Sequence, residues 1–320
     1  MPRIRTCGFR IAESASTSPH ALSRIVVIAR VVSSTRHPLV SRLHLGLGSV
    51  SPMADFLLAL ASITLMTGAL LFGWRLLAGA PLTTARAVWR GALALIVAVT
   101  ATGAGVYSLS SSRTYQLTGP LISRVETTDK VVALTFDDGP TAEHTQGVLD
   151  LLKAQEVTAT FYLTGRECEE NPAMLRAIIE AGHELGNHTY SHRKMLFVSS
   201  DELAREIERT DGVFEAAGYH DQTTFRPPGC KRLLATPWYL DKLSRATVTW
   251  DLEPDSGGLS GSPKGMVRQV AQEVRPGSIV LMHLMYDSRE PSREALPEII
   301  DRLRRQGYRF VTVSELLATR

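Results

Sequence analysis

Short apolar runs alternate with helix-like stretches from about residue 128 to the end of the chain. Runs of this length, bounded by turn-forming residues, are typical of buried strands. Strands that alternate with helices predict an α/β fold with a parallel sheet, either open or closed into a barrel. The predicted strands span residues 131–136, 159–164, 223–225, 246–250, 278–281 and 310–313.

The clearest helical pattern follows Ser199. Glu202 stands three residues later, so the pair forms a capping box at a helix start. Apolar residues then recur at helical spacing through Leu203 and Phe214 until Gly218, which is typical of a helix end. The pattern predicts one amphipathic helix between Ser199 and Gly218.

Two long uncharged segments precede this alternating region, at residues 56–74 and 91–112. Each approaches the ~20 residues that cross a bilayer. A buried helix of a soluble protein is the alternative for either segment, and cleavage after Ala80 is a second alternative for the first. No basic residue lies between Met53 and the first segment, which favours anchoring over cleavage. We therefore expect two transmembrane helices within residues 53–112.

The charge of the chain is divided unevenly. Residues 1–127 carry 12 Arg, no Lys and three acidic residues, whereas residues 128–320 carry 23 basic and 29 acidic residues. The basic excess therefore lies outside the predicted folded domain, and it gives no indication of a nucleic-acid partner. Residues 1–52 are rich in Ser and Arg without periodicity, so we expect a poorly ordered segment, and Met53 is an alternative start. The three cysteines form neither a disulfide framework nor a Cys-x-x-Cys pair.

The basic residues near the apolar segments bear on orientation. Arg75, Arg86 and Arg90 lie between the two segments and favour a cytoplasmic loop with an external C-terminal domain. The seven Arg of residues 1–52 favour the opposite orientation. We expect the external arrangement, partly because of the substrate class inferred below.

Adjacent carboxylates, Asp137 and Asp138, end the first predicted strand in "FDDGP". Two carboxylates side by side repel each other unless a cation is nearby. His188 and His192 are four residues apart, so on a helix they would project from one face and could bind one ion, although such histidines can also be structural. Asp138 with the two histidines makes a two-His, one-carboxylate set, which leaves positions open for water and substrate.

A different metal motif overlaps these residues. The stretch "HELGNH" resembles the zinc-protease motif His-Glu-x-x-His, but His183 and His188 are five residues apart. On a 3.6-residue helix, this spacing rotates the second side chain by about 140° from the first. Gly186 also disfavours a helix there. We expect His183 to be structural and reject the protease.

Four motifs occur in order along the chain: "TFDDGP", "HTYSH", "RPP" and "LMH". Together they resemble the polysaccharide deacetylases, the NodB-like domain of carbohydrate esterase family 4. The resemblance covers residues 128–317. It implies a distorted (β/α) barrel, a divalent metal that is usually Zn²⁺, and hydrolysis of N-acetyl groups on amino-sugar polymers.

The resemblance also implies roles for single residues. Asp137 corresponds to the general base, and Asp138, His188 and His192 correspond to the metal ligands. His283 corresponds to the general acid in the Leu-x-His motif that begins at Leu281.

Further supporting roles follow from the same resemblance. Arg226 corresponds to a groove residue near the base, and Pro228 and Gly229 belong to the loop that offers a backbone N–H to the reacting carbonyl. An acid histidine needs a carboxylate partner to remain protonated near neutral pH. Asp255 is our candidate for that partner, with Asp251 second.

Two positions depart from the family pattern. The family usually has an aromatic residue and a glycine after Arg-Pro-Pro, where this chain has Gly229 and Cys230. The family's Asp-Trp pair appears here as Asp255 and Ser256. Both changes leave the identity of the substrate open.

The sequence thus predicts four regions: a disordered segment (1–52), a membrane region (53–112), a linker (113–127) and a catalytic domain (128–317). We expect a metal-dependent hydrolase at the cell membrane that removes N-acetyl groups from an extracytoplasmic polysaccharide such as peptidoglycan or a chitin-like polymer. An O-acetyl carbohydrate esterase and a catalytically silent glycan-binding module are the alternatives. No protein partner is evident.

Overall fold

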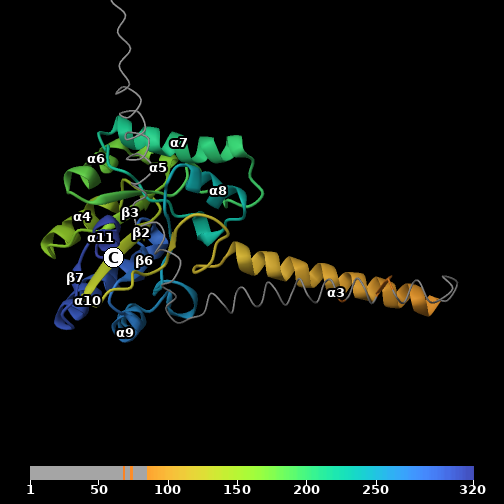
Figure 1. Cartoon of the computed structure of the whole chain (residues 1–320). Coiled ribbons are helices and arrows are strands. Elements are labelled where there is room, and N and C mark those ends of the chain that lie inside the picture. Colours follow the sequence, from red (N-terminus) through yellow and green to blue (C-terminus); the bar gives the residue numbers. More distant parts are fainter. Residues whose placement is uncertain (1–67, 69–72, 75–84) are drawn as a thin grey trace, which may run out of the picture. The chain divides into compact units, whose positions relative to one another are not determined.

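The computed structural model describes residue 68, residues 73–74 and residues 85–320 (Figure 1). Residues 1–52 and nearly all of the first apolar segment lie outside the described residues. The second apolar segment forms α3 (Ala85–Ser110).

One helix of the described part of the chain is long and apolar enough to cross a membrane, over Trp89–Ser110, with a mean hydropathy of 1.8. Its apolar side chains, among them Leu93, Ile96 and Val99, are exposed. The core helix of a soluble protein buries such side chains, so this helix differs from one. Of the two expected membrane helices, the structure therefore describes one candidate.

A five-stranded sheet of parallel strands forms the centre of the domain. Its strands run in the order β4-β3-β2-β6, and β7 pairs with the start of β2. A separate parallel pair joins β1 to β5. The strands are β1 (Leu121–Ile122), β2 (Val131–Asp137), β3 (Thr160–Leu163), β4 (Glu184–Asn187), β5 (Thr247–Val248), β6 (Ser278–His283) and β7 (Arg309–Phe310).

Helices follow most of the strands, as expected for parallel connections. They are α4 (Thr145–Ala154), α5 (Gly165–Glu170), α6 (Pro172–Glu180), α7 (Ser200–Ala216), α8 (Ala235–Lys242), α9 (Pro263–Glu273), α10 (Glu290–Arg305) and α11 (Val313–Ala318). Short 3₁₀ helices span Pro228–Cys230, Gly257–Leu259 and Asp287–Arg289. The predicted capping box is present at the start of α7, where Ser199 and Glu202 bond reciprocally.

All seven residues of β2 are buried, and the two faces of the strand meet different parts of the core. Val132, Leu134 and Phe136 pack in one apolar cluster with α4, α9 and α10. Val131 and Ala133 pack in a second cluster with Trp250, Tyr162 and α11. Successive strand residues point to opposite faces, so Thr135 and Asp137 share the face of Ala133. The sheet thereby places Asp137 on the face opposite α4, α9 and α10.

The structure confirms the α/β fold and changes several of its predicted details. Among the described residues, 223–225 form no strand, and Phe225 instead makes single-residue bridges to Asn187 and Thr247. The predicted strand 310–313 is wrong beyond Phe310, because Thr312 caps α11 there. The regular strands alone do not close a barrel. Residues 113–127, expected as a linker, include β1.

Candidate active site

Asp138, His188 and His192 come together at the carboxyl ends of β2 and β4. Their potential ligand atoms all lie within 4.8 Å of one another. Asp138 Oδ1 is 3.2 Å from His192 Nε2 and 3.8 Å from His188 Nε2. The structure therefore assembles the two-His, one-carboxylate set that the sequence predicts.

The hydrogen bonds of these residues fit a cation. The Nδ1 of His188 lies 2.7 Å from the carbonyl oxygen of Arg226. A carbonyl only accepts, so Nδ1 carries the proton and the Nε2 lone pair faces Asp138. Burial lowers the pKa of His188 even though two carboxylates oppose that effect, which favours the neutral imidazole that a metal needs. Asp138 Oδ1 is buried without a hydrogen-bond partner, and a bound cation would satisfy it.

The expected helix under the two histidines is wrong. Residues 188–192 form a loop that begins where β4 ends. Thr189 has φ 70° and His192 has φ 58°, both in the left-handed region that interrupts a helix. Asp138, with φ 74°, adopts the same unusual conformation. Strained residues of this kind tend to gather at functional sites, where the surrounding structure holds them in place.

Two residues that the sequence analysis did not identify hold this loop. Glu206 of α7 accepts hydrogen bonds from the backbone N–H groups of Tyr190 (2.9 Å) and Ser191 (2.8 Å) and from the Ser191 hydroxyl. Asn187, fully buried, accepts from the N–H of Thr189 at 3.0 Å. Both therefore position the histidine loop without touching the candidate metal site themselves.

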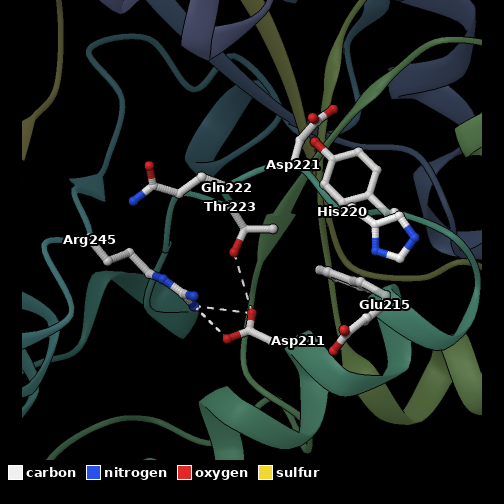
Figure 2. Close-up of a pocket in the computed structure, with 9 residues that line it drawn as sticks. Asp211, Glu215, His220, Asp221, Gln222, Thr223 and Arg245 are labelled. Carbon is white, nitrogen blue, oxygen red and sulfur yellow. Dashed lines mark hydrogen bonds and ion pairs between the residues drawn. The ribbon is translucent and has the colours of Figure 1, made fainter. Parts of the chain in front are cut away.

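Asn187 is in turn held by Asp211, whose Oδ1 accepts from its side-chain amide at 2.8 Å. Asp211 also accepts from Thr223 and pairs with Arg245 in a surface pocket (Figure 2). Figure 2 shows the side chains of Thr223 and Arg245 directed toward Asp211, with His220 pointing away from them. The pocket shares no residue with the candidate active site, so its polar network acts as support for Asn187.

Asp137 lies beside the candidate metal site, with its Oδ2 3.7 Å from His188 Nε2. Arg226, also fully buried, donates to Asp137 Oδ1 at 2.7 Å and to the hydroxyl of Thr135 at 2.8 Å. Burial alone would raise the pKa of Asp137, but the charge of Arg226 and the neighbouring histidines hold that pKa below its usual value. Asp137 is therefore an ionised carboxylate that can accept a proton.

The guanidinium of Arg226 is fixed from several sides. It also donates to the carbonyl oxygens of Val248 (3.3 Å) and Thr249 (3.1 Å), and it lies 3.9 Å from the ring centroid of Tyr162. These contacts leave the arginine one orientation. Arg226 therefore holds Asp137 in place and lowers the pKa of that carboxyl.

His283 ends β6 directly beside Asp137 in the register of the sheet. Asp255 is fully buried, and its Oδ2 lies 3.2 Å from His283 Nδ1 and accepts from the His283 backbone N–H at 2.6 Å. Burial lowers the pKa of His283, but the carboxylates of Asp255, Asp137 and Asp138 together outweigh that effect, so the pKa is raised, with Asp255 making the largest contribution of the three. Asp251, the second candidate, accepts instead from Ser278 and from the N–H of Ile279.

The remaining predicted residues lie around this centre. Leu281 is buried in β6, and Pro228 is buried at the start of its 3₁₀ helix. Gly229 has φ 57° and Cys230 has φ 60°, so a cysteine occupies a left-handed conformation where the family usually has glycine. The Cys230 sulfur contacts the carbonyl oxygen of Ser112 at 3.5 Å, outside the predicted catalytic domain.

His183 lies apart from this centre, as expected. Its Nδ1 accepts from the N–H of Ala159 at 3.3 Å, and its ring lies 5.0 Å from that of Phe161. Burial lowers its pKa to about 4, which keeps the ring neutral. His183 is a structural residue.

Comparison with known proteins identifies the family. The polysaccharide deacetylase family matches residues 124–248. A peptidoglycan-N-acetylglucosamine deacetylase of Bacillus cereus is 35% identical over 62% of this chain and 94% of its own length. The chain belongs to the polysaccharide deacetylase family. The peptidoglycan-N-acetylmuramic acid deacetylase of Bacillus subtilis is 33% identical over 62% of this chain, which spans 41% of that relative.

Solved structures of the polysaccharide deacetylase family include a pseudoenzyme. The wild-type family 4 pseudoenzyme of Bacillus anthracis has a TM-score of 0.56 and 30% identity, over 63% of this chain and 70% of that one. A mutant of it with restored enzymatic activity has a TM-score of 0.57 and 33% identity. These structures support the NodB-like fold. Because a pseudoenzyme shares this fold, the fold alone does not establish activity, and the individual site residues decide it.

Proposed function

We propose that this polysaccharide deacetylase is a metal-dependent hydrolase that removes N-acetyl groups from an extracytoplasmic amino-sugar polysaccharide, with peptidoglycan as the favoured polymer. One observation carries the proposal: the unpartnered, buried Asp138 Oδ1 faces two imidazoles beside the ionised Asp137. A module that only binds glycan needs no base, metal ligands or acid, whereas this site has candidates for all three.

A divalent cation held by Asp138, His188 and His192, for which we favour Zn²⁺, would polarise the acetamide carbonyl and make the attacking water more acidic. Asp137 takes the proton from that water, because its carboxylate is ionised and within reach of the same space. Arg226 keeps Asp137 charged and oriented during this step. The N–H of Gly229 is our candidate for stabilising the oxyanion.

Breakdown of the tetrahedral species requires protonation of a poor leaving group, the amine. His283 donates that proton, since it is the last residue of β6 and pairs with Asp137 in the sheet. Asp255 holds the imidazole in place and favours its protonated form. An ester leaving group needs less protonation, so this supported acid favours amide over O-acetyl hydrolysis.

The choice of polymer rests on the relatives. The two curated relatives described above are named as deacetylases of peptidoglycan N-acetylglucosamine and of peptidoglycan N-acetylmuramic acid. Gly229 has no side chain where the family usually has an aromatic residue, so we expect a wider site than usual on that side. We therefore favour peptidoglycan as the polymer, with either of its two N-acetylated sugars as the site of attack.

We further propose that α3 anchors the enzyme in the cell membrane, with the catalytic domain outside. The length, hydropathy and exposed apolar side chains of α3 support anchoring. The Arg residues between the two apolar segments support the external orientation. An external domain would meet its polymer directly.

The decisive experiment measures acetate released by the full-length chain from N-acetylated and O-acetylated oligosaccharides, with and without a chelator. We expect release from the N-acetylated glycan that stops on chelation and returns with Zn²⁺. Glycan binding without acetate release would establish the silent-module alternative. Faster release from the O-acetylated glycan would establish the esterase.

A pH profile tests the acid. In Asp255→Asn, we expect the alkaline limb of kcat/KM to move to lower pH, because the carboxylate that raises the pKa of His283 is gone and the acid must be protonated to act. Activity above that limb falls by about 10–100-fold. Asp251→Asn is the matched control, since Asp251 is a partly buried carboxylate of the same loop and bonds Ser278 instead. An alkaline limb that stays in place in Asp255→Asn would remove Asp255 from this role.

A further inference from the structure

Four large apolar side chains are exposed near the start of α8. They are Leu117 (47% exposed), Phe197 (85%), Leu234 (65%) and Trp238 (50%), and we call them the α8 patch. Single exposed apolar residues are common on protein surfaces, but a gathering of them marks an interaction site.

Two contacts join the segment before Phe197 to the start of α8. Met195 and Arg232 form a parallel bridge, and the Thr236 hydroxyl donates to the carbonyl oxygen of Met195 at 3.2 Å. The Trp238 N–H donates to the carbonyl oxygen of Leu234 at 3.3 Å, one helical turn along α8. Leu117 belongs to the adjoining segment, because the preceding residue, Gln116, accepts from the side chain of Arg232 at 3.0 Å.

The α8 patch lies on the outer side of α8. On the inner side, Leu240 is buried in an apolar cluster with Met195 and with Ile207 of α7. The stability of α8 therefore does not depend on burying Leu234 and Trp238. Their exposure needs an explanation outside the fold.

The end of the apolar helix α3 is attached at the same place. The Arg232 N–H donates to the carbonyl oxygen of Ser110 at 2.9 Å. The Lys231 ammonium lies 3.7 Å from the ring centroid of Tyr107 and bonds the hydroxyl of Ser111. Lys231 and Arg232, which directly precede the Leu234 end of α8, therefore hold the final turn of α3.

A buried guanidinium makes this attachment firm. Arg232 is 2% exposed and donates to the carbonyl oxygens of Ser112 (2.8 Å), Tyr115 (3.1 Å) and Cys230 (3.1 Å). These backbone acceptors fix the chain directly after α3 against the loop that contains Cys230.

Basic side chains surround the α8 patch. Lys194 is exposed, Lys231 lies over Tyr107, and the Lys242 ammonium is 3.4 Å from the ring centroid of Trp238. Tryptophan and tyrosine favour the headgroup region of a bilayer, and lysine is attracted to anionic headgroups. Asp241 is an acidic residue on the same helix, so the attraction is partial.

We propose that the α8 patch rests on the headgroup region of the same bilayer that α3 enters. The inference depends on the proposed membrane anchoring: if α3 leaves the bilayer near Ser110, the bonds of Arg232 hold the α8 patch at that level. The exposed apolar residues then contact lipid, and the basic residues contact anionic headgroups.

This placement bears on the substrate. The loop with His188 and His192 leads within a few residues to Phe197, and the His192 side chain is 48% exposed. The active site therefore lies close to the membrane surface. The enzyme would act on glycan next to the membrane rather than on distant layers of the polymer.

The experiment places an environment-sensitive fluorophore on the full-length chain in vesicles of phosphatidylcholine and phosphatidylglycerol. Cys7→Ser provides the background, because Cys168 and Cys230 are buried. Labels go to Leu234→Cys and Phe197→Cys in the α8 patch and to Asp301→Cys as the control. Asp301 is exposed on α10, which Figure 1 shows on a different side of the domain from α8.

We expect lipids with a shallow spin label to quench the probes at positions 234 and 197 at least about threefold more than the probe at position 301, with iodide showing the reverse order. Equal quenching at all three positions would overturn the proposal. Protection from iodide without lipid quenching would also overturn it, in favour of a protein contact. Acetate release by the same vesicles is measured separately, so an inactive enzyme with patch probes quenched by lipid would refute the proposed function alone.

Discussion

Asp137→Asn is expected to abolish acetate release while leaving the metal bound. An amide cannot take the proton from the attacking water, so we expect the rate to fall by about 10²–10⁴-fold. The metal remains because Asp138, His188 and His192 are unchanged. Acetate release and metal content, measured on the same preparation, test both parts.

The stability of Asp137→Asn needs a parallel measurement. Arg226 is fully buried and loses its charged partner, which costs up to about 3–5 kcal/mol in comparable buried pairs. Its bonds to Thr135, Val248 and Thr249 reduce that cost. Assays must therefore be run well below the Tm of the variant. A folded variant that loses metal as fully as a ligand mutant would refute the division between base and ligand.

His188→Ala is expected to lose the metal and, with it, the activity. It removes one of three ligands, so the fall in metal affinity should exceed the roughly 10–100-fold that changes in outer-shell partners produce. It also leaves the carbonyl oxygen of Arg226 without its donor. Calorimetric titration of Zn²⁺ into the metal-free protein measures the loss.

His192→Ala separates metal loss from unfolding. The His192 side chain is half exposed, so its removal leaves little cavity and the fold should persist. We expect the same loss of metal with an unchanged Tm for the metal-free protein. Full metal retention in this folded variant would mean that the cation binds elsewhere.

The sequence predicted the candidate metal-binding set because the chemistry of such a set depends on residue type. Asp138, His188 and His192 are brought together at strand ends, where a parallel sheet gathers its polar residues. The conformation under the histidines was not predictable from their spacing. Their loop contains residues in the left-handed conformation. It is held by Glu206, which comes 16 residues after Tyr190 in the sequence and belongs to α7.

One of the wrongly predicted strands could have been recognised as a helix start from the sequence. Thr312 and Glu315 form a capping box that begins α11, although residues 310–313 also read as an apolar run. The strand predicted at residues 223–225 is wrong for another reason. Its neighbours Asn187 and Thr247 pair with it only through Phe225, and such single-residue pairing depends on the tertiary arrangement. The bonds of Arg226 to Val248 and Thr249 likewise depend on the tertiary arrangement, whereas Asp255 was predicted from the sequence as the candidate partner of His283.

The contacts of Arg232 determine where the domain can be cut. The family match begins at residue 124, yet Arg232 is satisfied by carbonyl oxygens of Ser112 and Tyr115. A fragment that starts at residue 124 would lack these two carbonyl oxygens, so the charged Arg232 guanidinium would lose hydrogen bonds that it makes in the longer chain. The segment between α3 and residue 124 is thus part of the smallest unit that can be expected to fold, and a shortened version should start no later than Ser110.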